Sequence, residues 1–135
     1  MANEAVIIEL LGDRGDVITM NCADGTAIAK GAILQITDNR TALASAADKP
    51  VAGIAASEKI ADDGQTTIGV YTNGIFDLKD AGAGGAVGLC VSLGGVNTIK
   101  TAAANADLGY ILGKRLATSG AAGTESVRVQ IGKVY

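Results

Sequence analysis

Short runs in which apolar residues recur at every second position, each closed by a tight turn, constrain the fold of this chain more than any other feature. A period of two places successive side chains on opposite faces of a β-strand. Many of the chain's 19 glycines stand between the runs, where they accept backbone conformations that other residues avoid. The clearest alternating runs are Val6/Ile8/Leu10, Val87/Leu89/Val91/Leu93 and Val127/Val129/Ile131. This pattern predicts an all-β fold.

Strands are expected along most of the chain. The predicted ranges are 5–10, 17–22, 32–37, 41–44, 51–55, 66–72, 75–78, 87–93, 97–100, 110–116 and 126–131. A helical turn is expected within 101–108, where Thr101 is suited to cap its start and Gly109 to end it. We therefore predict a small β-barrel or β-sandwich-like fold with at most one or two short helical turns.

The size and composition of the chain fit a single folded domain, residues 1–135. Of the residues, 48% are hydrophobic and 19% are charged, which is enough apolar material for a core and too little charge for extended disorder. Aromatic residues make up only 3%, so the core must be built from thin layers of aliphatic side chains.

The segment around Asn73-Gly74 predicts a β-hairpin. Both residues tolerate the positive φ angles of a type I′ turn, and residues that favour strands flank them. A two-residue turn would pair Tyr71 with Phe76 on one apolar face. The opposite face of this hairpin is apolar as well, so it needs a cover from a loop or from another subunit.

A weak internal repeat runs through the sequence. The similar segments are 51–54 with 111–114, 66–70 with 126–130, and 31–34 with 85–88. Gly53 and Gly113 take matching places in it. Two such halves would interlock as a small pseudo-symmetric barrel, although a composition this biased also produces such similarity by chance.

The residue types of common active sites are missing or scattered. The chain has no His, which removes the usual acid–base group and every Ser–His or Cys–His nucleophile pair. Asp62 and Asp63 are adjacent carboxylates, but they stand beside Gly64, as residues that cap a turn do. We predict no enzymatic activity and no cofactor.

Cys22 and Cys90 stand far apart, without the spacing of a metal site. We interpret them as small buried apolar residues with free thiols, and we expect no bound metal. A disulfide between them is the alternative, which a reducing compartment disfavours.

The charge pattern disfavours nucleic acid as a partner. The net charge is −3, and the basic residues are scattered apart from Lys114-Arg115, whereas phosphate binding needs clustered cations. No apolar run approaches the ~18 residues of a membrane span. The N-terminus lacks a basic region followed by an apolar one, so we expect no signal peptide, no membrane association and cytoplasmic synthesis.

Several segments resemble a known family in their order and type. The segment 24–37, DGTAIAKGAILQIT, resembles a family hallmark of an apolar residue, a glycine, a small residue and an alternating apolar run. The strand around Gly53 and the segment 66–76 follow in the family's order. The chain is thus similar to the capsid decoration, or cement, proteins of tailed phages, including the lambda head-decoration type.

This resemblance implies a β-tulip-like structural virion protein. It would bind the major capsid protein on the outer surface of an icosahedral shell and stabilise it, after synthesis in the host cytoplasm. It implies a homo-oligomer, with a trimer favoured and a dimer as the alternative. It also implies an N-terminal capsid-binding arm within residues 1–6. The residues of that arm are Ala2, Asn3, Glu4, Ala5 and Val6.

A second function class stays open at this point. A small β-barrel interaction or swivelling module of a cellular protein, dimerising through swapped hairpins, would have the same composition and the same lack of catalytic groups. Electron microscopy of purified virions separates the two, because a decoration protein gives external density in fixed ratio to the shell protein.

Overall fold

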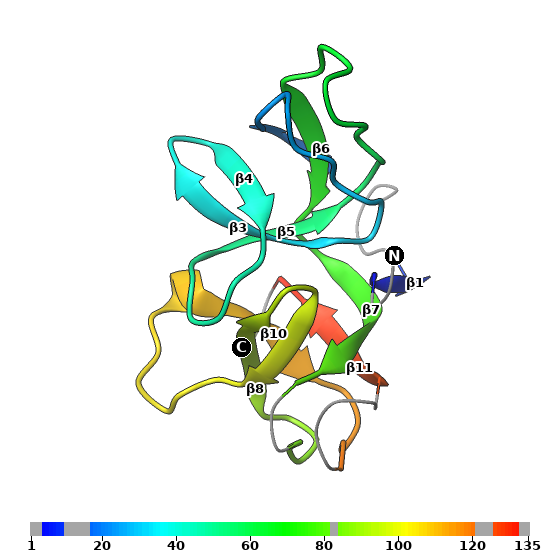
Figure 1. Ribbon diagram of the computed structural model, residues 1–135. Coiled ribbons are helices and arrows are strands. Elements are labelled where there is room, and N and C mark those ends of the chain that lie inside the picture. The colour runs from blue at the N-terminus through cyan, green and yellow to red at the C-terminus, as the bar shows by residue number, and fades with distance from the viewer. Residues whose placement is uncertain (1–3, 10–16, 82–83, 121–125, 133–135) are drawn as a thin grey trace.

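The computed structural model describes residues 4–9, 17–81, 84–120 and 126–132, and most of their strands form two closed five-stranded barrels (Figure 1). In the N-terminal barrel the strand order is β2-β4-β3-β5-β6. These strands are β2 (Val17–Asn21), β3 (Ile33–Asp38), β4 (Thr41–Ala44), β5 (Val51–Ala55) and β6 (Thr67–Tyr71). The predicted all-β fold class is confirmed.

The C-terminal barrel follows in the chain. Its sheet has the order β1-β7-β11-β10-β8-β9, and a parallel pairing between β7 and β9 closes it. Strand β1 is added to the outside of β7 and is not part of the closed ring. The strands are β1 (Val6–Glu9), β7 (Gly74–Asp80), β8 (Cys90–Gly95), β9 (Thr98–Thr101), β10 (Ile111–Arg115) and β11 (Ser126–Ile131). Leu10, predicted to belong to the first strand, lies outside the described residues.

One short helical element is present among the described residues, the 3₁₀ turn Leu108–Tyr110. The predicted helical turn at 101–108 is therefore misplaced. Thr101 is the last residue of β9, not a helix cap, and Gly109 lies within the 3₁₀ turn instead of ending it.

The two barrels share one topology and one register, so the repeat is real. In each barrel one strand pair is parallel, β2–β4 and β7–β9, and the others are antiparallel. Leu34 pairs with Gly53 in the first barrel, and Val91 pairs with Gly113 at the same place in the second. A Cβ on Gly53 would lie 2.2 Å from the carbonyl oxygen of Tyr71, and one on Gly113 would lie 2.1 Å from that of Gln130. Only glycine fits both places.

The halves form two barrels side by side in sequence, not one interlocked barrel, and two predicted matches between them are wrong. Segment 126–130 corresponds to 67–71, not to 66–70, because Ile54 pairs with Tyr71 as Lys114 pairs with Gln130. Gly31 corresponds to Gly88, not to Gly85, because both stand in the turn before the second strand of their barrel, with φ angles of 88° and 91°. Gly85 instead forms an isolated bridge with Ser119.

The predicted hairpin at Asn73-Gly74 is wrong. Strand β6 pairs with β2 and β5, while β7 pairs with β1, β9 and β11, so these two residues connect one barrel to the other. Tyr71 and Phe76 still touch, with ring centroids 6.0 Å apart. The two apolar faces of the predicted hairpin are buried in two different cores: Phe76 packs in the core of the C-terminal barrel, and Ile68 and Val70 pack in that of the N-terminal barrel.

The two cores meet at the junction of the barrels. Ile33 and Ile54 come from the N-terminal barrel but pack with the buried residues of the C-terminal one. Two buried polar residues add a link here: the backbone N–H of Asn97 donates to Ser45 Oγ at 2.9 Å, and that of Ile33 donates to Asn97 Oδ1 at 2.9 Å. The barrels are joined by shared apolar packing and by satisfied hydrogen bonds.

Candidate functional site

The N-terminal strand β1 is an edge strand with apolar residues on its surface. It pairs antiparallel with β7, Val6 opposite Asp77 and Ile7 opposite Phe76. Val6 is 56% exposed and Ile7 is 37% exposed. No described residue pairs with the outer edge of β1. A strand edge of this kind offers both hydrogen-bonding groups and apolar contact area to a partner.

The residue before β1 is held by the body of the protein. The backbone N–H of Ala5 donates to the carbonyl of Gly31 at 2.6 Å, and the Ala5 side chain packs against the C-terminal core. Gly31 has no room for a side chain, because a Cβ there would lie 2.8 Å from the Ala5 carbonyl oxygen. Of the predicted arm, Ala5 and Val6 are therefore docked on the barrels, Glu4 is half-buried, and Ala2 and Asn3 lie outside the described residues.

A second exposed apolar edge lies on β2. Val17 is 47% exposed and Ile18 is 37% exposed. β2 pairs with β6 along its whole length, but β4 meets it only at Asn21. This edge was missed by the sequence prediction, which had no means of telling an edge strand from an inner one.

A buried charged cluster fills the end of the C-terminal barrel. The Arg115 guanidinium donates to Asp80 Oδ2 at 2.5 Å, to Ser119 Oγ at 2.6 Å and to Thr101 Oγ1 at 3.0 Å. Ser119 Oγ in turn donates to Asp80 Oδ2 at 2.8 Å. Both charged side chains are fully buried, and a Cβ on Gly85 would lie 2.7 Å from Arg115 Nε. The cluster has no opening for a substrate, so its role is to tie strands together.

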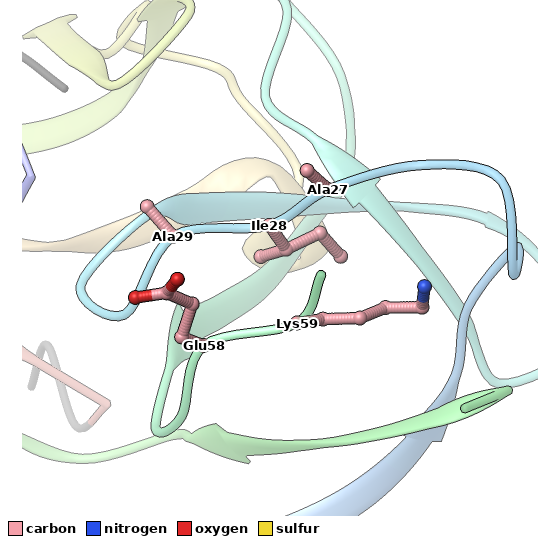
Figure 2. Close-up of a pocket in the computed structure, with 5 residues that line it drawn as sticks. All are labelled: Ala27, Ile28, Ala29, Glu58 and Lys59. Atoms are coloured by element: carbon pink, nitrogen blue, oxygen red, sulfur yellow. The ribbon is translucent and has the colours of Figure 1, made fainter. Parts of the chain in front are cut away.

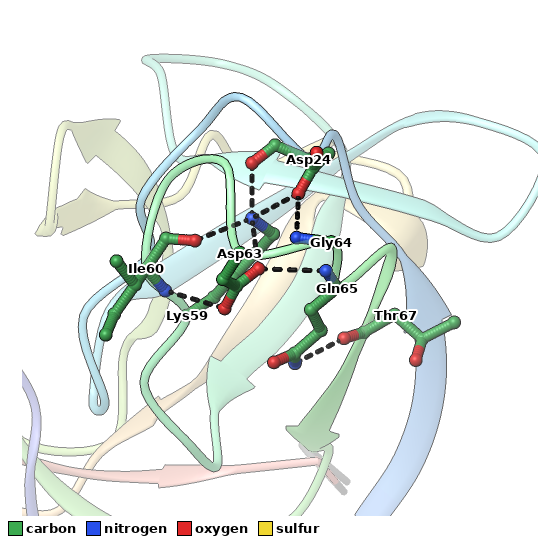
Figure 3. A network of polar contacts seen from close by, with 7 residues as sticks. All are labelled: Asp24, Lys59, Ile60, Asp63, Gly64, Gln65 and Thr67. Carbon is green, nitrogen blue, oxygen red and sulfur yellow. Dashed lines mark hydrogen bonds and ion pairs between the residues drawn. The ribbon is translucent and has the colours of Figure 1, made fainter.

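The N-terminal barrel has a lysine at the corresponding end (Figure 3). Lys59 is fully buried, and its ammonium donates to the carbonyls of Asp24 at 2.6 Å and Ile60 at 3.1 Å, and to Asp63 Oδ1 at 3.4 Å. Asp63 also accepts hydrogen bonds from the backbone N–H groups of Gln65 and Ile60. The prediction that Asp63 caps a turn is confirmed.

These contacts shift two pKa values. The backbone N–H of Gln65, with Lys59 and Ile60 adding to it, holds the pKa of the Asp63 carboxyl below its usual range. Burial raises the pKa of the Cys22 thiol, against the opposing charge of Lys59. Neither group has the surroundings of a reactive centre, since Asp63 is committed to backbone donors and Cys22 is buried and protonated.

One open hollow of about 160 Å³ lies beside Lys59 (Figure 2). Its lining is mostly apolar, and the Lys59 ammonium points away from it toward Asp24. Ligand pockets usually measure about 300–1,000 Å³ and place several polar groups around the ligand. The hollow is too small and too poor in polar groups to be a small-molecule site.

The described residues contain neither a cluster of metal ligands nor a helix that could cross a membrane. Cys22 is buried and Cys90 is half-buried, and both are free thiols. Among residues 4–9, 17–81, 84–120 and 126–132, no three His, Cys, Asp or Glu side chains gather as metal ligands would. In the same residues, no helix has the length and apolar character that a membrane crossing requires.

A comparison with protein families gives a match over most of the chain. No curated protein matches this chain at a significant level of similarity. A family model described as phage cement protein matches residues 12–131, which include both barrels but not β1. The matched region thus covers the whole repeat and most of the chain. Together with the all-β fold, this match shows that the chain belongs to the phage cement protein family, whose role is structural and associated with the capsid.

Proposed function

We propose that this chain binds the outer surface of a phage capsid, through the major capsid protein, and stabilises the shell. The family match gives the association with the capsid. The observation that supports surface binding is the exposed N-terminal strand, whose apolar residues Val6 and Ile7 are held at the edge of the C-terminal barrel. A role of this kind needs no catalytic group and no cofactor.

The working form in this proposal is a homotrimer. One barrel pair offers a small contact area, and small interfaces bind weakly on their own. A trimer brings several such contacts to the lattice at once, which raises the overall affinity by roughly 10²–10⁴ where the geometry allows simultaneous binding.

The N-terminal segment is proposed as the capsid contact. Deleting residues 2–6 would also remove the hydrogen bond and the core packing of Ala5, so that variant would confuse binding with folding. Deleting residues 2–4 keeps Ala5 and β1. We expect this shorter deletion to lower occupancy on shells while lowering the melting temperature of the free protein less than deletion of residues 2–6 does.

The test is to reconstruct purified virions by electron microscopy and to add the purified protein back to shells that lack it. The wild-type protein and a Val96→Lys variant, changed at a 67% exposed residue in the turn between β8 and β9, should decorate shells equally. Shells decorated by the 2–4 deletion at wild-type occupancy would exclude residues 2–4 from the capsid contact and leave only Ala5 and Val6 of the proposed arm. Virions without external density from this protein would overturn the proposed function.

A further inference from the structure

The edge of β2 that faces away from β6 presents backbone groups without a strand partner in the described residues. The backbone N–H of Asn21 donates to the Arg40 carbonyl at 2.6 Å, and the Arg40 guanidinium donates to the Thr19 carbonyl at 2.7 Å. In a strand, alternate residues direct their N–H and C=O to the same side. Val17 and Thr19 therefore direct theirs to this open side.

The matching edge in the other barrel is occupied. The parallel contact of Asn21 with Thr41 corresponds to that of Lys79 with Thr98. Just before this contact, β7 pairs with β1, and the β7 residues involved correspond to Val17, Ile18 and Thr19 on β2. Among the described residues, the first barrel thus lacks the added strand that the second has at this edge (Figure 1).

The composition of β2 does not protect this edge. Natural edge strands carry lysine, proline or inward charges that prevent pairing with other chains. The sequence of β2 is VITMN, with no charge and no proline, and its exposed residues include Val17 and Ile18. One guanidinium covers one carbonyl here, and because Arg40 is exposed it can turn into solvent when a strand arrives.

We propose that the open edge of β2 accepts the outer edge of β1 from a second copy of this chain, which continues the sheet from one molecule into the next. The matching edge of β7 already accepts this strand within one molecule, and its outer side has no partner in the described residues. The pairing would bring exposed Val6 and Ile7 against exposed Val17 and Ile18. It supplies a contact for the homo-oligomer and rests on that part of the proposed function.

The contact joins two different surfaces, so it is head to tail. Each copy carries one donor edge and one acceptor edge. Head-to-tail contacts form rings where the rotation between copies closes, and open filaments where it does not. A ring of copies is the form expected here.

The first test is the mass of the protein by light scattering over a range of concentrations. Thr19→Pro removes an N–H on the open side only, so pairing with β6 is retained. Val17→Lys puts a charge on the same edge, and Val96→Lys is its matched control in a turn. We expect wild type and Val96→Lys to form the same oligomer, and Val17→Lys and Thr19→Pro to fall to the mass of one chain with their circular dichroism unchanged.

The second test joins the two edges covalently. In a background with Cys22→Ala and Cys90→Ala, an Ile7→Cys variant is mixed with a Val17→Cys variant under oxidising conditions, because an antiparallel pairing of Val6 and Ile7 with Val17 and Ile18 puts Ile7 opposite Val17. Paired strands bring Cα atoms to about 4.5–5.5 Å, which a disulfide can span. A mixed covalent dimer is expected, whereas Ile7→Cys with Val96→Cys should give none.

The outcomes separate this proposal from its alternatives. A wild-type protein that is a single chain at every concentration, or a Val17→Lys oligomer of wild-type mass, would overturn it. If the β2 variants keep their oligomer but lose binding to shells, the edge serves a strand of the shell protein and the second-copy proposal is wrong. If the ring forms through this edge but virions lack the protein, the proposed function fails and this contact stands.

Discussion

The two barrels have the same backbone plan but different interiors. At the end of the C-terminal barrel, Arg115 is buried with Asp80, Ser119 and Thr101 around it. At the matching positions the N-terminal barrel carries Ala55, Cys22, Lys59 and Ala44. The C-terminal barrel thus holds a buried ion pair at this end. The N-terminal barrel holds small residues and Lys59, whose ammonium donates to the backbone carbonyls of Asp24 and Ile60.

The comparison indicates that the Arg115 guanidinium and its three side-chain acceptors occur together or not at all, although the buried Nε of Arg115 has no hydrogen-bond partner among the described residues. A buried guanidinium without hydrogen-bond partners is costly, so Arg115 requires its acceptors together. Where the arginine is replaced by Ala55, the acceptors are replaced as well. The strand arrangement is fixed by the shared register and by Gly53 and Gly113, and it is compatible with either set of buried side chains.

Breaking one member of the charged set should have the largest effect. Asp80→Ala leaves the Arg115 guanidinium buried without its anionic partner, so we expect a loss of about 3–5 kcal/mol in the free energy of unfolding. The double variant Asp80→Ala with Arg115→Met removes the charge and should recover most of that loss. Urea unfolding of both variants measures this, and equal losses would show that the ion pair is not the reason.

The aromatic pair at the junction gives the next effect. Phe76 is fully buried in the C-terminal core, so Phe76→Ala should cost about 3–5 kcal/mol. Tyr71 is half-buried and packs at the edge of that core, so Tyr71→Ala should cost clearly less. Thermal and urea unfolding should show a larger loss of stability for Phe76→Ala than for Tyr71→Ala. The reverse order would show that Phe76 is not the main aromatic residue of this core.

Substitution of Gly53 and Gly113 tests whether the neighbouring strand approaches equally closely in the two barrels. Gly53→Ala and Gly113→Ala both force a methyl group onto a carbonyl oxygen of the neighbouring strand, so each should cost about 1–3 kcal/mol. Gly53 also has a φ of 145°, which disfavours alanine, so its variant should lose more. If either variant unfolds like wild type, that strand approach is looser than the register indicates.

The smallest effect is the pH dependence of the lysine cluster. The pKa of Asp63 is lower in the folded protein than in the unfolded chain, so its contribution to stability is present above the unfolded pKa and fades as pH falls through the folded value. Wild type should therefore exceed Asp63→Asn by a constant small margin at neutral pH, and the margin should shrink below about pH 4. A margin that persists in acid would assign the effect to hydrogen bonding instead of charge.

Much of the strand pattern is readable from the sequence, because period and turn residues are local signals. The predicted strands at 41–44, 51–55 and 126–131 match the structure residue for residue. The strand predicted from Val87 begins instead at Cys90, because Gly88 takes a φ of 91° and leaves Val87 and Leu89 exposed.

Pairing partners are not local, and this is where prediction failed. Asn73-Gly74 has the chemistry of a hairpin turn, yet the same two residues serve equally well as a connector between barrels. The burial of Arg115 and Lys59 was not predicted, since nothing in their neighbours along the chain reveals the acceptors that surround them. An available signal was Gly113, whose match to Gly53 places Arg115 on the inner face.

The connector at Asn73-Gly74 has a consequence for how the chain folds during synthesis. The strands of the first barrel all lie before it, so this barrel can close while the second is still being translated. Strand β1 comes first in the chain, but it cannot pair until β7, which follows the connector, has been synthesised. Until then its apolar edge and the junction residue Ile54 have no cover, and this interval is the time at which the nascent protein most needs protection from aggregation.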